Sequence, residues 1–378
     1  MKVLAYIDPM SYNNLEMYDV ALLSNNKKFK IYFFCSTKLI TQYLNGGVIK
    51  RIFNYNDKKG IAKVISYLIS MFQLFIFVKF YKINLIHVQW FRLPVFELYY
   101  YKLIKLFYPK IKLVHTAHNV LPHNFKEKDK KYFCKLYLLF DSIILHTENS
   151  LAEIKKLTSS NTDKFIVIPH GILKYPFSSN DIQKKLNSLD FLHKLENKTV
   201  FVSLGSQHYY KGIDILVNVW LDTPDLRNNE SIILLIAGKG SIPRIEELVK
   251  LQNVIIENKF IDDLTFVTYM SLADVVLLPY RKISQSGVLL TAIGLRKPVL
   301  VSDAGGLSDP LKYGKIGWKI RAGDSVSLSE KLKLLVSNRK LIDDVLNNFE
   351  GWNNVVKNYE WENIQQKTFQ LYEHLLSN

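Results

Sequence analysis

The loop at residues 205–212, with the sequence GSQHYYKG, has the residue types of a phosphate-binding turn. It follows an apolar run and leads into a segment whose apolar residues recur at helical spacing. Lys211 and Gly212 open that segment, where a helix N-terminus would expose unpaired N–H groups and the positive end of its dipole. The spacing matches neither the Walker loop nor GxGxxG, so a plain glycine turn beside a surface lysine is the alternative.

A second region with anion-binding character lies at residues 274–309. An apolar run ends at Pro279-Tyr280, the sequence SQSG at 284–287 enters a helical pattern, and another apolar run ends in small residues at 302–306. Small residues let an anion approach backbone N–H groups closely. A turn would explain each glycine singly, but two such loops in one half of the chain favour a ligand site.

The elements that position these loops are short apolar runs alternating with helical patterns. This alternation predicts an α/β fold of two doubly wound domains, each with a parallel sheet whose carboxyl edge binds ligands. The expected strands are 3–7, 30–35, 85–90, 112–117, 142–147 and 165–170, then 199–205, 231–238, 253–259, 274–280, 298–303 and 317–320. Helical patterns include 98–107, 130–140 and 352–376, and the polar residues 174–197 are the expected linker.

Length and composition agree with two globular domains: there are 378 residues, 48% of them hydrophobic and 22% charged. Two cysteines, Cys35 and Cys134, exclude a disulfide framework or a Cys-rich metal site. As a helix, residues 64–78 would extend about 22 Å, short of a bilayer core of about 30 Å, so we expect a buried or interfacial helix there. Met1-Lys2 runs straight into an apolar strand, and we expect no cleavable signal peptide.

The positive charge is concentrated in the first half. Residues 1–180 hold 26 lysines and arginines against 11 aspartates and glutamates, a net +15, whereas residues 181–378 have a net +1. A basic half can meet nucleic acid, an anionic membrane or a phosphorylated substrate. Genomic base composition is the alternative, since lysine outnumbers arginine 42 to 8.

The second half resembles the donor domain of glycosyltransferase family 4, a group of retaining enzymes with the GT-B fold. The matching stretches are Gly205 with Tyr210-Lys211-Gly212, LLIAGKG at 234–240 and residues 272–307, and in the first half 86–94, 115–123 and 167–172. Bacterial polysaccharide-assembly transferases share the YKG and SQSGV sequences. The resemblance implies two Rossmann-like domains facing across a cleft. These would be an acceptor-binding domain at 1–178, with a C-terminal helix at about 356–378 packing back on it, and a nucleotide-sugar donor domain at 195–355.

Carried over onto this sequence, the resemblance gives His118 and Lys211 catalytic roles. Lys211 would hold the donor diphosphate, and His118 would point at the reacting sugar. A histidine whose hydrogen bonds are satisfied at a strand end is the alternative for His118. The expected donor-binding residues are Gly205, Ser206, Lys211, Gly212, Arg281, Gln285, Ser286, Gly287, Val288 and Thr291, and the expected acceptor-binding residues are His87, Trp90, His115, Asn119, His123 and His170.

The chain departs from the family pattern at several positions. Two glutamates that many relatives carry are replaced by Thr291 and by a residue near Ile283. The arginine common after the loop glycine is Ser206, for which Arg281 and Gln285 could compensate. A Gly-rich turn after the first strand is replaced by SYNN at 11–14. The identity of the donor, UDP- or GDP-linked, therefore stays open.

The resemblance implies transfer of a hexose from a nucleoside-diphosphate sugar to a glycan acceptor, with retention. We expect a lipid-linked (polyprenyl-diphosphate) acceptor, a role in lipopolysaccharide or capsule synthesis, and a cytoplasmic protein peripheral to the inner membrane face, seated through Lys-rich stretches at 102–112 and 126–131. No cofactor or metal is expected, because the sequence has no DxD motif, and its histidines show no HxxxH or HExxH helix pairing and no cysteine partner. A nucleotide-sugar epimerase of the same fold and an inactive scaffold are the alternatives. Nucleic acid is not an expected partner, because no RNP, KH or helix-turn-helix pattern is present.

Overall fold

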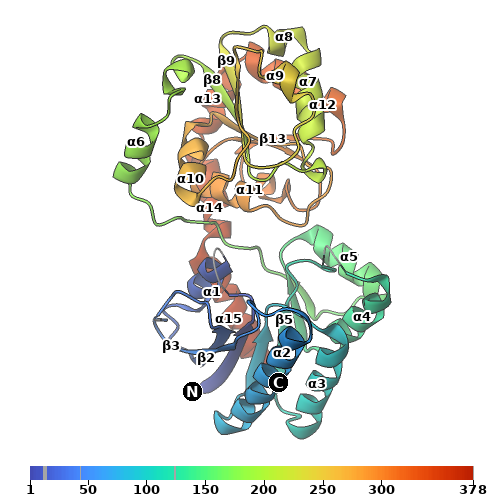
Figure 1. Cartoon of the computed structure of the whole chain (residues 1–378). Helices are drawn as coiled ribbons and strands as arrows, with labels where there is room; N and C mark the ends of the chain where they lie inside the picture. The colour runs from blue at the N-terminus through green and yellow to red at the C-terminus, as the bar shows by residue number, and fades with distance from the viewer. Residues whose placement is uncertain (12–14, 43, 123–124, 378) are drawn as a thin grey trace. The chain divides into compact units, whose positions relative to one another are not determined.

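The chain folds into two compact units, which we describe from a computed structural model that covers residues 1–11, 15–42, 44–122 and 125–377. Unit 1 consists of Met1–Gly171 and Trp361–Asn378, and unit 2 of Ile172–Glu360. In each unit a parallel sheet carries helices on both faces (Figure 1). The last helix, drawn in red, returns to the N-terminal elements of unit 1.

Unit 1 is built on a parallel sheet with the strand order β3-β2-β1-β4-β5-β6-β7. Its strands are β1 (Lys2–Asp8), β2 (Phe29–Ser36), β3 (Gly47–Phe53), β4 (Leu85–Val88), β5 (Lys112–Thr116), β6 (Ser142–Leu145) and β7 (Phe165–Val167). Its helices are α1 (Leu15–Leu23), α2 (Gly60–Phe80), α3 (Pro94–Phe107), the short η1 (Glu127–Asp129), α4 (Lys130–Leu139), α5 (Glu148–Thr158) and α15 (Trp361–Ser377). The order reverses between β1 and β4, which pair from Leu4 with Leu85 to Ile7 with Val88.

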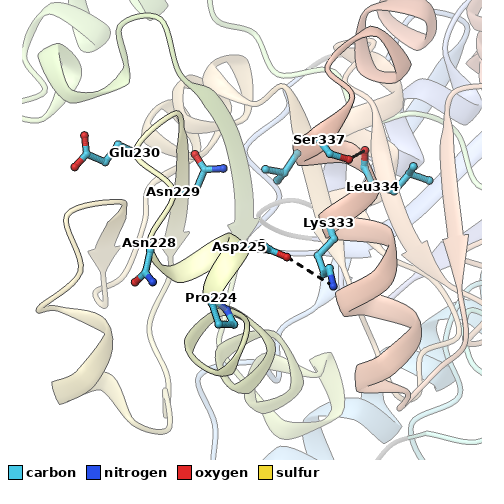
Figure 2. A pocket seen from close by; sticks show the side chains of 9 residues that line it. Pro224, Asp225, Asn228, Asn229, Glu230, Lys333, Leu334 and Ser337 are labelled. Atoms are coloured by element: carbon cyan, nitrogen blue, oxygen red, sulfur yellow. Dashed lines mark hydrogen bonds and ion pairs between the residues drawn. The ribbon is translucent and has the colours of Figure 1, made fainter.

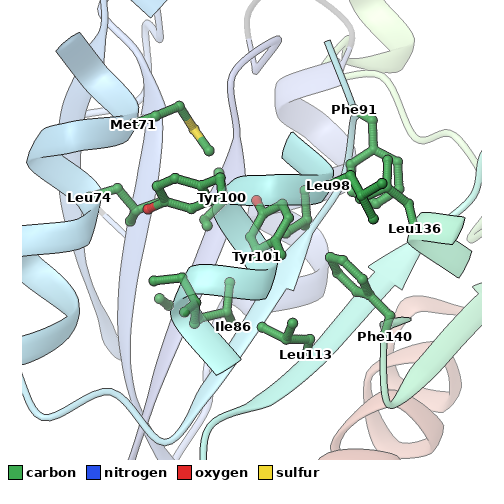
Figure 3. Packing of buried hydrophobic residues seen from close by; sticks show 14 of the residues in the cluster. Met71, Leu74, Ile86, Phe91, Leu98, Tyr100, Tyr101, Leu113, Leu136 and Phe140 are labelled. Atoms are coloured by element: carbon green, nitrogen blue, oxygen red, sulfur yellow. The ribbon is translucent and has the colours of Figure 1, made fainter. Parts of the chain in front are cut away.

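Two apolar layers hold unit 1 together, because its strands are hydrophobic on both faces. Helices α2, α3, α4 and α5 cover one face, and α1 and α15 cover the other. Figure 3 shows the first layer, in which side chains of α2, α3 and α4 meet those of β4 and β5; the labelled residues are Met71, Leu74, Ile86, Phe91, Leu98, Tyr100, Tyr101, Leu113, Leu136 and Phe140.

Unit 2 is a second parallel sheet, with the strand order β10-β9-β8-β11-β12-β13. Its strands are β8 (Thr199–Leu204), β9 (Ile232–Ala237), β10 (Val254–Glu257), β11 (Val275–Leu278), β12 (Val299–Ser302) and β13 (Gly317–Ile320). Its helices are α6 (Ser179–Asn187), η2 (Leu192–Leu195), η3 (Tyr209–Lys211), α7 (Ile213–Asp222), α8 (Pro224–Arg227), α9 (Ile245–Leu248), α10 (Asp263–Leu272), α11 (Gly287–Gly294), η4 (Asp309–Lys312), α12 (Ser325–Ser337), α13 (Lys340–Leu346) and α14 (Phe349–Tyr359). Here the strand order reverses between β8 and β11.

Unit 2 also has an apolar layer on each face. Helices α10, α11 and α14 pack on one face, and α7, α8, α9, α12 and α13 pack on the other. Every residue of β9 is buried, as expected for an inner strand covered on both sides. The two sheets confirm the prediction of two doubly wound α/β domains. In sheets of this kind, the loops at the carboxyl ends of the strands where the order reverses form the ligand crevice.

Three details of the structure differ from the sequence prediction. The prediction missed β3, an edge strand with only one fully buried residue, whose lysine and arginine interrupt the apolar pattern. Residues 174–197, expected to be a linker, contain α6 and η2, and α6 contacts α10. The C-terminal helical pattern is two helices, α14 in unit 2 and α15 in unit 1, which separate at Glu360.

Helix α2 is long and apolar enough, by length and composition alone, to cross a membrane. One of its sides is nevertheless part of the unit 1 core, through Tyr67, Met71, Leu74 and Val78. Its Ser70 hydroxyl donates to the Ile52 carbonyl of β3 at 2.6 Å. The helix therefore lies along the sheet with one side packed against it.

Candidate functional site

The loop after β8 in unit 2 is shaped by close backbone contacts that exclude a side chain. Gly212 has φ +69°, and a Cβ there would lie 2.0 Å from the Pro279 carbonyl oxygen at the end of β11. Gly205 has φ +91°, a conformation that glycine adopts without steric cost. These two glycines bring the β8 and β11 loops together at the point where the strand order reverses.

Lys211 lies within this pair of loops, with its ammonium over the Tyr280 ring at 5.7 Å from the centroid. A Cβ on Gly205 would lie 3.1 Å from Lys211 Nζ, so the cation reaches the carboxyl end of β8. Burial lowers the pKa of Lys211 to about 8, and among the described residues no carboxylate pairs with its ammonium. A partly desolvated cation of this kind gains most from an anionic ligand.

The N-terminus of α11 lies beside Lys211. Ser286 caps the helix, its hydroxyl oxygen accepting from Leu289 N at 3.3 Å. Gly287 and Val288 then hold the first helical positions, where N–H groups have no partner within the helix. Val288 Cγ2 lies 3.6 Å from the position of a Cβ on Gly205, so α11, β8 and Lys211 converge on one point. Fixed N–H groups and a cation at one point are suited to binding phosphate.

The other residues expected to bind the donor do not all point toward the place where Lys211 and the start of α11 meet. Arg281 forms an ion pair with Asp214 and lies over the Tyr209 ring at 4.3 Å, so its charge is largely occupied within the loop. The Thr291 hydroxyl is buried and donates to the Gly287 carbonyl at 2.9 Å, which directs it along its own helix rather than toward a ribose. Ser206 is exposed on the loop.

Buried polar atoms without a hydrogen-bond partner gather in this loop pair. Among the described residues ten side-chain atoms are of this kind, and four of them belong to it: Asp214 Oδ1, Tyr280 OH, Arg281 Nε and Gln285 Oε1. Leaving such a group unpaired costs about 1–3 kcal/mol. Their concentration at one place indicates a site that a polar ligand completes.

Unit 1 has a cavity of about 590 Å³ at the carboxyl ends of β4 and β5. Four residues that the sequence assigned to acceptor contact or catalysis line it, namely Trp90, His115, His118 and Asn119. The wall also contains further aromatic residues, such as Phe91, Phe125 and Tyr137, together with small and polar residues and the charged Arg92, Lys126 and Asp129. Aromatic walls with a few polar groups are typical of small-molecule sites. His123 lies outside the described residues.

His118 is held from several directions. Its ring stacks on Trp90 with centroids 4.4 Å apart and planes at 13°. Its Nε2 lies 2.9 Å from Gln89 Oε1, and its Nδ1 lies 3.3 Å from His146 Nε2. Burial lowers the pKa of His118 well below its usual value, which keeps the imidazole neutral near pH 7.

The hydrogen bonds around His118 fix its tautomer. His146 Nδ1 lies 2.9 Å from the Ile168 carbonyl and must donate to it, so His146 Nε2 accepts from His118 Nδ1–H. His118 Nε2 is then an acceptor, which requires the amide nitrogen of Gln89 to face it. The amide oxygen of Gln89 then faces His87 Nε2, which donates to it.

The network continues from Gln89 into the core of unit 1. Gln89 lies 3.0 Å from His87 Nε2, and His87 Nδ1 lies 2.5 Å from the Tyr372 hydroxyl of α15. His87 is completely buried, so the prediction that it contacts an acceptor is wrong, and it orients Gln89 instead. His170 is absent from the described cavity wall, and its Nδ1–H donates to the Gly171 carbonyl at 2.7 Å.

A buried acidic pair at the end of β1 was missed by sequence reasoning. Asp8 accepts from Met10 N at 2.6 Å, and Asp19 accepts from the Tyr6 hydroxyl at 2.8 Å. Burial raises the pKa of Asp8 to about 6 and raises that of Asp19 as well, and the two carboxyls interact. Asp8 ends β1, the strand at which the sheet order reverses. An acidic residue at the carboxyl end of this strand could have been recognised from the sequence as a candidate site residue.

A larger hollow in unit 2, about 650 Å³, lies at the opposite edge of the sheet. Figure 2 shows it between the segment that precedes β9 and helix α12, with Lys333 3.7 Å from Asp225. Its wall includes Asn228, Asn229 and Glu230, which lead into the amino end of β9. Parallel sheets bind ligands at their carboxyl edge, so size alone does not make this hollow the functional site.

Comparison with known sequences connects unit 2 to one family. Residues 198–338 match the family described as glycosyl transferases group 1. An uncharacterized glycosyltransferase of Methanocaldococcus jannaschii is 24% identical over 236 residues, 61% of this chain and 59% of the relative. A GDP-mannose:glycolipid 4-beta-D-mannosyltransferase of Xanthomonas campestris pv. campestris is 31% identical over 96 residues, 24% of this chain and 26% of the relative. The matches thus span less than two thirds of each relative's length.

Solved structures extend the likeness to the whole chain. Sucrose-phosphate synthase from Thermosynechococcus elongatus has a TM-score of 0.73 at 18% identity and covers 100% of both chains. Anabaena HepE in complex with UDP has a TM-score of 0.71 at 14% identity, covering 99% of this chain and 100% of its own. WaaG, a glycosyltransferase involved in lipopolysaccharide biosynthesis, has a TM-score of 0.62 at 15% identity, covering 98% and 99%. The fold is therefore that of the GT-B glycosyltransferases.

Proposed function

We propose that this protein is a glycosyltransferase that moves a hexose from a nucleoside-diphosphate sugar to a lipid-linked glycan, with retention of anomeric configuration. The observation that carries the proposal is the convergence of Lys211, the N-terminus of α11 and four unpartnered polar groups on the loops between β8 and β11. A nucleoside diphosphate supplies the negative charge and the hydrogen-bonding groups that this arrangement lacks. UDP in the HepE structure and GDP-mannose in the name of the Xanthomonas relative support this ligand class.

In this reaction the bond from the anomeric carbon to the diphosphate breaks, a bond from an acceptor hydroxyl oxygen to that carbon forms, and the hydroxyl proton passes to the leaving diphosphate. Negative charge grows on the leaving diphosphate. Lys211 and the N–H groups of Gly287 and Val288 would stabilise it without moving, which makes such a site effective. Because a cation and a helix dipole supply the charge, we propose that no metal ion or cofactor takes part.

His118 would contact the reacting sugar as a neutral imidazole. Both ring nitrogens of His118 have partners within the unit, so it would contact the sugar through its ring carbons, while the other aromatic and polar residues of the cavity wall offer stacking and hydrogen bonding. We assign this cavity to the acceptor, with Trp90, His115 and Asn119 as contacts. The glycolipid acceptor in the name of the Xanthomonas relative and the lipopolysaccharide role of WaaG support a lipid-linked acceptor and a place in bacterial cell-surface polysaccharide synthesis. A peripheral position at the inner membrane face follows from this proposal, because a lipid-linked acceptor is anchored in the membrane.

The test is a thermal-shift screen of the full chain against UDP, GDP, ADP and CMP. A ligand that binds the native state raises the apparent stability, and at a hundred times its Kd the gain is about 2.7 kcal/mol. We expect one of the diphosphates to stabilise the protein. If none of the four nucleotides raised the melting temperature, the proposed donor site would be overturned and a scaffold protein would be favoured.

The second step uses sugars linked to the nucleotide that binds. Incubation with a polyprenyl-diphosphate-linked acceptor is expected to give a product with the anomeric configuration of the donor, read by NMR. Conversion of the nucleotide sugar to its epimer without any acceptor would instead identify an epimerase.

A further inference from the structure

The outward side of α2 carries a continuous apolar stripe. Its residues follow one another three or four positions apart, which places them along a single side of the helix. They are Ile61, Ile65, Ile69, Phe72, Ile76 and Phe80, and each is exposed. Side chains on the opposite side, such as Met71 and Leu74, are buried in the unit 1 core, so this helix is apolar on both sides.

Helix α3 adds a second stripe of the same kind. Val95, Tyr99, Leu103 and Leu106 recur every three or four residues and are exposed, as is Phe107. The two helices lie side by side, because the Phe75 ring of α2 meets the rings of Tyr100 and Phe107 of α3 at 6.4 and 6.1 Å (Figure 1). The stripes therefore belong to one surface, which we call the α2–α3 face. Contiguous apolar surface of this extent normally has a partner.

The charges around the α2–α3 face have one sign. Between residues 58 and 112 the sequence has ten lysines and arginines and a single acidic residue, Glu97. Glu97 is buried, where it accepts from the Tyr67 hydroxyl at 2.6 Å, and burial raises its pKa to about 7. Exposed lysines stand at both ends of α2, at Lys58 and Lys59 and again at Lys79 and Lys82. Unit 1 as a whole holds 26 lysines and arginines against 13 aspartates and glutamates, a net +13, whereas unit 2 has a net +3.

We propose that the α2–α3 face docks on an anionic phospholipid bilayer, with α2 lying in the plane of the membrane surface. Apolar side chains would enter the boundary between headgroups and acyl chains while the lysines meet lipid phosphates. This inference rests on the proposed function in one respect: docking on the membrane would hold the acceptor cavity of unit 1 near a lipid-linked acceptor. The sequence prediction assigned membrane binding to lysines at 102–112 and 126–131, and expected of residues 64–78 only a buried or interfacial helix.

Charge complementarity decides between a bilayer and a second copy of the chain. Two copies joined through this face would bring their lysine rims together, and like charges in contact oppose association. An anionic bilayer supplies both the apolar interior and the opposite charge. A spanning arrangement is excluded for this packing, because it would remove Tyr67, Met71, Leu74 and Val78 of α2 from the unit 1 core.

The experiment is flotation of the full chain with vesicles of phosphatidylcholine alone and of phosphatidylcholine with phosphatidylglycerol. We expect binding to the anionic vesicles and a decrease as salt is raised. The variant Phe72→Ser with Phe80→Ser is expected to lower the partition coefficient about tenfold or more, since each phenylalanine contributes apolar area to the bilayer.

The matched control is Phe349→Ser with Phe260→Ser in unit 2. Phe72 and Phe349 are each 65% exposed, and Phe80 and Phe260 are 74% and 82% exposed, so the two pairs remove similar exposed surface. Equal flotation of the two variants would overturn the proposal. A second result would also overturn it: the parent chain does not float, light scattering shows that it is a dimer, and the Phe72→Ser, Phe80→Ser double variant is a monomer.

Flotation needs no sugar donor, so its result is separate from that of the nucleotide screen. The Phe72→Ser and Phe80→Ser variant is expected to keep the full nucleotide-induced thermal shift. A chain that floats with anionic vesicles but binds no nucleotide would support the membrane surface and contradict the proposed activity. A chain that binds a nucleotide but does not float would support the activity and overturn the membrane surface.

Discussion

The two sheets reverse their strand order in the same way, yet their carboxyl edges have opposite chemistry. In unit 2 the edge presents a cation, Lys211, and open N–H groups at the start of α11. In unit 1 the edge has a neutral hydrogen-bonded histidine network and a buried acidic pair, Asp8 and Asp19. Burial moves both key ionisable groups toward neutrality, lowering the pKa of Lys211 to about 8 and raising that of Asp8 to about 6.

The difference follows from how each edge satisfies its polar groups. The unit 1 histidines are paired within the unit, so their geometry is set before any ligand arrives. In unit 2, four buried polar atoms of the β8 and β11 loops have no partner among the described residues. The topology of the sheet thus determines where a ligand binds. The side chains determine whether the polar groups of the site are already paired, as in unit 1, or need a charged ligand to pair with them, as in unit 2.

The largest effect that would separate the two edges is expected for Lys211→Ala. Loss of the only cation reaching Gly205 in the described part of the chain should cut release of nucleoside diphosphate from the sugar donor about a hundredfold, as for other groups that stabilise a developing charge. Lys297→Ala is the matched control. Lys297 is a similarly buried lysine of unit 2, but it precedes β12 at the amino edge and donates to the Ser271 carbonyl at 2.6 Å.

Equal losses for Lys211→Ala and Lys297→Ala would show that burial of a lysine, and not its place at the carboxyl edge, governs turnover. The pH dependence gives a second readout. Lys211 is charged below its pKa of about 8, so nucleotide affinity should be constant below that pH and fall by up to about tenfold per pH unit above it.

The acidic pair gives the next largest effect, on stability. Because burial raises the pKa of Asp8 from 3.8 to about 6, the folded state binds a proton that the unfolded state releases between these values. Stability is therefore lost as pH rises from about 4 to 6, by about 2–3 kcal/mol for this group. Asp8→Asn cannot ionise and keeps an oxygen that accepts from Met10 N.

We expect Asp8→Asn to raise the free energy of unfolding at pH 7.5 by about 2 kcal/mol and to change it little at pH 4, measured by denaturant titration. Asp163→Asn, at an exposed position of the same unit, should show no such difference between the two pH values. A pH-independent change for Asp8→Asn would refute the assignment of a raised pKa.

The carboxyl edge of unit 2 was more predictable from the sequence than that of unit 1, for a physical reason. Gly205, Lys211 and Gly212 act within one short loop, and residues 284–288 form one helix start, so local spacing carries the information. The partners of Thr291 and Arg281, the Gly287 carbonyl and Asp214, could not be predicted in this way, because they depend on side-chain direction.

The unit 1 edge is assembled from residues far apart in the chain. Tyr372 meets His87 across 285 positions, and His118 meets Gln89 across 29. No periodicity encodes such contacts, so sequence reasoning found His118 and Trp90 by resemblance and missed Gln89, His146 and Asp8. The strands themselves were found because buried parallel strands are continuous apolar runs. The exposed edge strand β3 was not found, since only one of its residues is fully buried.

A smaller effect is expected at Gln89, the residue that joins the two halves of the histidine network. Gln89→Leu removes the hydrogen bond to His118 Nε2 and should lower turnover about tenfold while the nucleotide-induced thermal shift is unchanged. Gln89→Glu places a carboxylate 2.9 Å from that nitrogen and should raise the pKa of His118. The acid limb of the pH–rate profile should then move to higher pH, which a purely structural role would not cause.

The smallest effect is expected for the cap of α11. Ser286→Ala removes the hydroxyl that accepts from Leu289 N, at a cost of about 1 kcal/mol in stability. Asp262→Ala removes the corresponding cap of α10, which accepts from Thr265 N at 2.9 Å, at a similar cost. Of these two helices α11 begins at the proposed phosphate site and α10 does not, so Ser286→Ala should also weaken nucleotide binding, by about fivefold in a calorimetric titration, and Asp262→Ala should not. If both variants left nucleotide affinity unchanged, the start of α11 would not contribute to donor binding and Lys211 would act alone.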